Sequence, residues 1–93
     1  MSELTARQLS IFEKYTGDID GLLRSGTQEE KAAVDDQTWA EIAAFCQQLV
    51  LQKRGLLGKA AEEELVAQIS DRIPDERVVQ RLRNIAMRMA SNL

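Results

Sequence analysis

The residues of this sequence best suited to recognising another molecule are arginines near its C-terminal end. Between positions 77 and 93 there are four arginines and no acidic residue. An α-helix turns about 100° per residue, so Arg77, Arg81 and Arg88 fall within roughly 40° of one another, and Asn84 joins the same face. Guanidinium groups bind carboxylates and phosphates through a planar fork of donors. We therefore take Arg77, Arg81, Asn84 and Arg88 as the candidate partner-binding residues.

This arginine face allows three interpretations. It docks an acidic protein, it binds nucleic acid as the second helix of a helix-turn-helix, or it pairs with acids of the same chain. The nucleic-acid interpretation is disfavoured because Asp75 and Glu76, which phosphates repel, lie at the start of the same helix. The expected acidic partners within the chain are Glu13, Asp18, Asp20, Asp35 and Asp36.

The residue types that catalysis most often needs are scarce. The sequence contains no histidine, which excludes histidine-based triads, histidine-ligated zinc or iron, and a histidine proton shuttle. Its one cysteine, Cys46, falls in the middle of an apolar helix face, where a buried thiol is expected rather than a reactive thiolate. The consecutive acids at 62–64 point about 100° apart on a helix and do not converge on one substrate. We expect no enzyme activity, no cofactor and no metal site.

Two short segments resemble ligand-binding loops but lack the residues that define them. Segment 55–60 resembles a phosphate-binding loop, yet its glycines are too close together and Ala60 stands where a serine or threonine is required. Segment 18–21 resembles the start of a calcium loop, yet alignment on Gly21 places threonines at the first and last ligand positions. A turn between helices and a helix cap explain these two segments better.

Apolar residues recur every three or four positions along most of the chain, and this spacing predicts helices. Four main helices are expected, at about 3–24, 37–54, 59–72 and 75–91, plus one short helical turn near 28–34. Residues 16–18 offer a break in the first helix, with Asp18 as the cap of a second piece. Thr27 and Glu30 match a capping box, and Asp35 offers a further cap.

Aromatic residues and one apolar stripe define the expected core. Four aromatic residues lie on helix faces that we expect to be buried: Phe12, Tyr15, Trp39 and Phe45. In segment 59–72, Leu65 and Ile69 repeat at a spacing of four, with Val66 beside them. Some apolar residues have no obvious place in this core: Leu51, Leu56, Leu57 and Met87. Apolar residues that group together on a surface would mark an interface.

Length, composition and charge set the class of protein. A chain of 93 residues, 44% of them hydrophobic and 29% charged, suits one globular helical domain over 1–93. The net charge is −3, with nine acids and four bases in 1–46 but six acids and eight bases in 47–93. An acidic chain lacks the field that concentrates a protein on phosphates. The N-terminus does not resemble a secretory signal, the longest apolar run is too short for a membrane span, and a single cysteine suits the cytoplasm.

These features together predict an all-α protein that folds as a single compact bundle. We expect a small non-catalytic protein-binding module, such as an adaptor, inhibitor, immunity protein or regulatory subunit, that acts through helix-face contacts. Two alternatives stay open. One is a nucleic-acid-binding regulator that uses the face of Arg77, Arg81 and Arg88, and the other is a purely structural homo-oligomeric helical protein. The expected partner is a protein, a homodimer included, rather than nucleic acid or a membrane.

Overall fold

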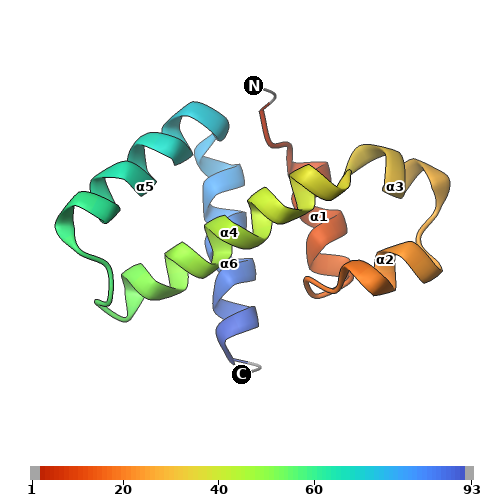
Figure 1. Cartoon of the computed structure of the whole chain (residues 1–93). Helices are drawn as coiled ribbons and strands as arrows, with labels where there is room; N and C mark the ends of the chain where they lie inside the picture. Colours follow the sequence, from red (N-terminus) through yellow and green to blue (C-terminus); the bar gives the residue numbers. More distant parts are fainter. Residues whose placement is uncertain (1–2, 92–93) are drawn as a thin grey trace.

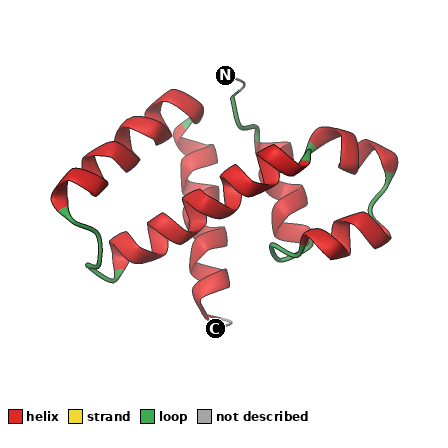
Figure 2. Cartoon of the chain, viewed as in Figure 1, coloured by secondary structure: helices red, strands yellow, loops and turns green. Residues whose placement is uncertain are grey.

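A computed structural model describes residues 3–91 of the chain, and every regular element in this range is an α-helix (Figures 1 and 2). The helices are α1 (Ala6–Lys14), α2 (Ile19–Ser25), α3 (Gln28–Ala33), α4 (Asp36–Lys53), α5 (Lys59–Arg72) and α6 (Glu76–Ser91). The predicted all-α bundle is therefore confirmed, with overall extents of 40 × 30 × 21 Å. Among the described helices, none is long and apolar enough to cross a membrane.

The segment expected as one helix over 3–24 is two helices. The backbone is left-handed at Thr16, with φ 52°, and at Gly17, with φ 75°, which ends α1 and redirects the chain into α2. Asp18 caps α2, as expected for a second piece, because its carboxylate accepts a hydrogen bond of 3.1 Å from the N–H of Asp20. The break at 16–18 is thus a real turn rather than a kink.

Side-chain caps fix where the next helices begin. In the predicted capping box of α3, the Thr27 hydroxyl accepts from the Glu30 N–H (3.1 Å) and the Glu30 carboxylate accepts from the Thr27 N–H (3.0 Å). Asp35 caps α4 by accepting from the N–H of Thr38 (2.7 Å), also as predicted. By contrast, α5 follows Gly58 and has no side-chain cap.

The core lies where α1, α4 and α6 meet, and α4 crosses α6 near the centre of the molecule (Figure 1). Phe12 of α1 and Trp39 of α4 pack with ring centroids 4.7 Å apart, and Phe45 is buried as well. Tyr15 differs from the expectation. It is half-buried at the edge of the core, because its hydroxyl donates a hydrogen bond of 2.8 Å to the Glu30 carboxylate.

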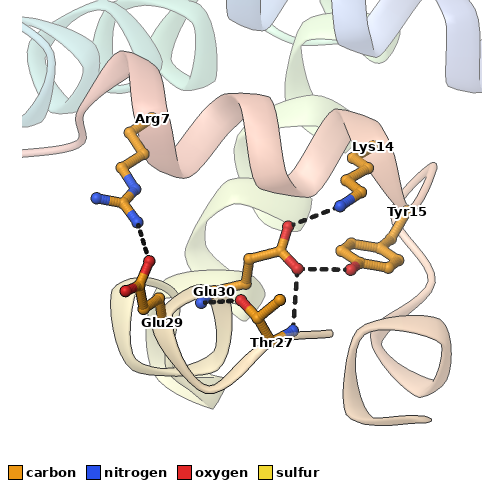
Figure 3. A network of polar contacts seen from close by, with 6 residues as sticks. All are labelled: Arg7, Lys14, Tyr15, Thr27, Glu29 and Glu30. Atoms are coloured by element: carbon orange, nitrogen blue, oxygen red, sulfur yellow. Dashed lines mark hydrogen bonds and ion pairs between the residues drawn. The ribbon is translucent and has the colours of Figure 1, made fainter. Parts of the chain in front are cut away.

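A polar network joins α1 to α3 on the outside of this core (Figure 3). Glu30 accepts from the Lys14 ammonium at 3.0 Å and from the Tyr15 hydroxyl, while Arg7 and Glu29 form a longer ion pair of 3.8 Å. The backbone donor of the capping box, together with Lys14 and Tyr15, lowers the pKa of Glu30 to about 2. The network holds α3, which buries none of its residues, against the end of α1.

The remaining helices lie at opposite ends of α4, with α2 and α3 at one end and α5 at the other (Figure 1). Helix α5 packs lightly, since Leu65 and Arg72 are its buried residues, and Arg72 pairs with Glu41 of α4. Val66 was expected beside the buried stripe but is 56% exposed, because it is turned about 100° from Leu65. Leu57, which had no expected place, packs against the core.

Candidate partner-binding site

Two of the predicted partner-binding arginines contact the same carboxylate of the chain itself. Arg81 Nη2 lies 3.2 Å from Glu13 Oε1, and Arg88 Nη1 lies 3.7 Å from Glu13 Oε2. Pairing with Glu13 was one of the interpretations that the sequence allowed. These two arginines therefore join α6 to α1, and their role toward a partner stays a prediction.

The other two predicted residues have local partners on or beside α6. Arg77 lies 3.4 Å from a carboxylate oxygen of Asp75, and its N–H donates to the same side chain at 2.9 Å. These bonds, the backbone one foremost, lower the pKa of Asp75. Asn84 accepts a hydrogen bond of 3.2 Å from Gln80. The predicted face is thus divided between the start of α6, the contact with α1, and Asn84 at the edge of the face that lies toward α4.

The side of α6 next to Asn84 borders a groove between α6 and the C-terminal half of α4. Two adjoining hollows of about 310 and 340 Å³ form the groove. Both hollows are lined by Val50 and Lys53 of α4 and by Met87 of α6; Arg83 and Asn84 line the first, and the second reaches the end of α4. In Figure 1 the two helix segments that supply these residues are the green end of α4 and the blue end of α6. We call this surface, whose principal residues are Val50, Lys53, Arg54, Arg83 and Met87, the α4–α6 groove.

The cations of the α4–α6 groove are not neutralised within the described chain. Across residues 3–91, none of Lys53, Arg54 and Arg83 forms an ion pair with a carboxylate, and all three are exposed. The Lys53 ammonium instead donates to the Met87 sulfur at 3.0 Å. No aspartate or glutamate is found among the described residues that line the two hollows. The groove is therefore a locally basic surface on an acidic protein.

The floor of the groove is apolar. Val50 is half-buried, and Met87 is 39% exposed although it lies between two cationic side chains. Methionine is flexible and polarisable, so it adapts to the shape of an apolar ligand group. Basic side chains around an apolar floor attract a ligand that combines carboxylates with an apolar side chain. The chemistry that this arrangement supports is binding.

The other residues that the sequence analysis considered for catalysis or ligand binding lie in the core, in a helix cap or in a turn. Cys46 is 2% exposed, and its burial raises the pKa of the thiol to about 12, so the thiolate is not formed near neutral pH. Segment 18–21 begins α2, where Asp18 is the cap. Segment 55–60 forms the turn from α4 into α5, with Gly55 at φ 71°. Within 3–91 no three histidine, cysteine, aspartate or glutamate residues gather as metal ligands would.

Sequence reasoning missed most of the α4–α6 groove, although signals for it were present. Lys53 and Arg54 were interpreted only through the helix dipole, which favours cations in a last turn. Arg83 lies about 140° from the centre of the arginine face and was left out of it. Met87 was recognised as an apolar residue without a place in the core, and Met87 and Asn84 were the sequence signals that pointed to this surface.

A comparison of the chain with protein-family models, with curated proteins and with solved structures gives no match. The functional argument therefore starts from the groove itself. Its starting points are the charge of Lys53, Arg54 and Arg83 and the exposed side chain of Met87.

Proposed function

We propose that this protein is a small non-catalytic protein-binding module of the cytoplasm, an adaptor, inhibitor, immunity protein or regulatory subunit, that binds its partner in the α4–α6 groove. The partner surface that fits the groove is acidic and carries at least one apolar side chain. Such a surface would neutralise Lys53, Arg54 and Arg83 while it covers Met87.

One observation carries the proposal. Within residues 3–91 the cations of the groove have no acidic partner and lie around an exposed apolar side chain, whereas the arginines of the predicted face have carboxylates beside them. Arg81 and Arg88 already share Glu13, so a partner that bound them would compete with that contact. Lys53 and Arg83 offer no such competition. An incoming carboxylate gains more from a cation that has not yet been paired.

The nucleic-acid alternative has less support. A recognition helix leads into the major groove with its N-terminal residues. In α6 those residues include Glu76, and Arg77 beside it is held by Asp75. Negative charge at this position opposes the approach of phosphates. The proposal therefore keeps a protein as the partner.

Affinity capture with matched variants tests the proposal. The groove variant Lys53→Glu/Arg83→Glu reverses two exposed groove cations. The control variant Arg24→Glu/Lys31→Glu changes the net charge equally at two cations that lie outside the groove and form no ion pair within residues 3–91. Each purified protein is immobilised, incubated with native lysate of the source cells at low ionic strength, and washed with increasing salt. Circular dichroism establishes that the variants keep their helix content.

The expected result is that the wild type and the control retain the same protein, and that the groove variant recovers at least about tenfold less, as for a loss near 1.4 kcal/mol of binding free energy. Elution of that protein by salt is expected as well, because exposed ion pairs are screened. Equal recovery by the groove variant, or recovery of no protein by the wild type, would contradict the proposal.

A further inference from the structure

Helix α5 carries three consecutive acids in its first half. Glu62, Glu63 and Glu64 form no ion pair within residues 3–91, and Glu64 only accepts a hydrogen bond of 3.2 Å from Gln68. Glu63 and Glu64 are exposed and Glu62 is half-buried. Lys59 lies one turn before Glu62 and Glu63 but forms no ion pair with either of them.

The same helix presents an apolar side chain among these acids. Val66 is 56% exposed and lies three and four residues after Glu63 and Glu62, so the three side chains share one face of the helix. Leu56, just before α5, is 66% exposed. Because α5 lies at one end of the molecule, a second molecule can approach this face (Figure 1). The face combines carboxylates with an apolar centre.

This face is complementary to the α4–α6 groove. The groove surrounds Met87 with Lys53 and Arg83, while α5 surrounds Val66 with Glu62 and Glu63. The two surfaces of one molecule do not meet, since no α5 residue is among the described residues that line either hollow. Within one molecule, α5 turns its buried side toward α4 instead, where Arg72 pairs with Glu41. A contact between groove and acidic face therefore needs two molecules.

We infer that the occupant of the α4–α6 groove is α5 of a second copy of this chain. The inference rests on the proposed function, because it names a partner for that same binding site. Val66 of one copy covers Met87 of the other, and the acids of α5 neutralise Lys53 and Arg83. If each copy binds α5 of the other in its groove, the two contacts form a closed two-fold dimer. If only one of the two grooves is filled in each pair, the free groove and the free α5 can bind further copies and form larger assemblies.

The contact is small and depends on charge, so we expect weak association that salt reduces. Sedimentation equilibrium at low ionic strength measures it over a range of concentrations up to millimolar. The groove variant Lys53→Glu/Arg83→Glu and the helix variant Glu62→Lys/Glu63→Lys each place like charges on both surfaces. Val66→Lys is a second helix variant at an exposed position. It tests the same contact independently if the first helix variant disturbs the folding of α5. Arg24→Glu/Lys31→Glu again serves as the control.

The wild type and the control are expected to exceed the monomer mass of 10.4 kDa increasingly with concentration, while each groove or helix variant alone stays at 10.4 kDa. An equimolar mixture of the groove and helix variants should associate again, since each reversed groove then meets a reversed helix. This recovery distinguishes a specific contact from a general effect of net charge.

A wild type that stays at 10.4 kDa at millimolar concentration would overturn the self-association. So would a mixture of the two charge-reversed variants that fails to associate, or a groove variant that associates as the wild type does. None of these results decides the proposed function. The lysate experiment tests it independently, by measuring whether the groove variant loses a captured protein. The two proposals can thus fail separately.

Discussion

At the scale of single residues, Glu30 accepts hydrogen bonds from three groups in two segments of the chain. Its carboxylate binds the Lys14 ammonium, the Tyr15 hydroxyl and the N–H of Thr27 (Figure 3). All three donors stabilise the charged form, which lowers the pKa of Glu30 from 4.5 to about 2. The folded state therefore binds a proton at Glu30 less readily than the unfolded state does.

This difference predicts how Glu30 contributes to stability as pH changes. Because the folded pKa is lowered, the contribution is complete above the ordinary pKa of 4.5 and disappears as pH falls toward 2. The variant Glu30→Gln should unfold at lower urea concentration than the wild type at neutral pH, and the two midpoints should converge near pH 2. Urea titrations across this range measure the effect. A midpoint difference that does not change with pH would contradict the assignment.

The ion pairs that join α5 and α6 to the core should differ in strength because they differ in burial. The side chain of Arg72 is 11% exposed and lowers the pKa of Glu41, whereas the side chains of Arg81 and Arg88, which contact Glu13, are 40% and 71% exposed. We expect Glu41→Gln to cost about 2 kcal/mol of unfolding free energy and Glu13→Gln less than about 1 kcal/mol, since water screens the exposed pairs. Urea unfolding of both variants at neutral pH gives the comparison. An equal or larger loss for Glu13→Gln would contradict it.

At the scale of elements, the turn between α1 and α2 stores strain at Thr16. A β-branched residue rarely adopts a left-handed backbone, and φ at Thr16 is 52°. Asparagine tolerates this conformation, so Thr16→Asn should raise the free energy of unfolding by about 1 kcal/mol, or Tm by about 4–8 °C. Thermal unfolding followed by circular dichroism measures the shift.

A substitution at the neighbouring Gly17 should change the stability of the same turn in the opposite direction. Its φ is 75°, and a Cβ added there would lie 3.0 Å from Met89 Cε. Gly17→Ala should therefore lower Tm while Thr16→Asn raises it, although the two changes lie side by side. If both variants shift Tm in the same direction, left-handed strain does not control this turn.

The starts of α2, α3 and α4 were predictable from the sequence because a side-chain cap depends on residues close together in the chain. Asp18, Thr27 and Asp35 each accept from an N–H two or three residues later, so local types and spacing were enough. The exposure of Val66 and the groove at Met87 were not predictable in this way. They depend on how α4 crosses α6 and on which side α5 packs, and these are contacts between residues far apart in the sequence.

At the scale of the whole molecule, buried contacts are distributed unevenly among the helices. Helices α1, α4 and α6 share the core, and fully buried side chains such as Phe12, Ile42 and Leu82 come from all three. Helix α5 contributes mainly Leu65, lacks a side-chain cap at its start, and follows a turn with Gly55 in a left-handed conformation. A helix with few buried contacts opens locally at a lower free energy than the core does.

Hydrogen exchange should therefore divide the molecule into a protected core and a less protected α5. In dilute solution, where the proposed association is expected to be negligible, amides of residues 63–72 should exchange at least about tenfold faster than those of residues 42–50 in α4. This difference corresponds to an opening free energy about 1.4 kcal/mol lower. In concentrated solution the proposed contact covers α5, so the same amides should slow while those of residues 42–50 change little. Mass spectrometry of peptides from both segments at the two concentrations measures this. Equal protection of the two segments in dilute solution would show that α5 belongs to the same cooperative unit as α4, and the light packing of α5 would then not govern its stability.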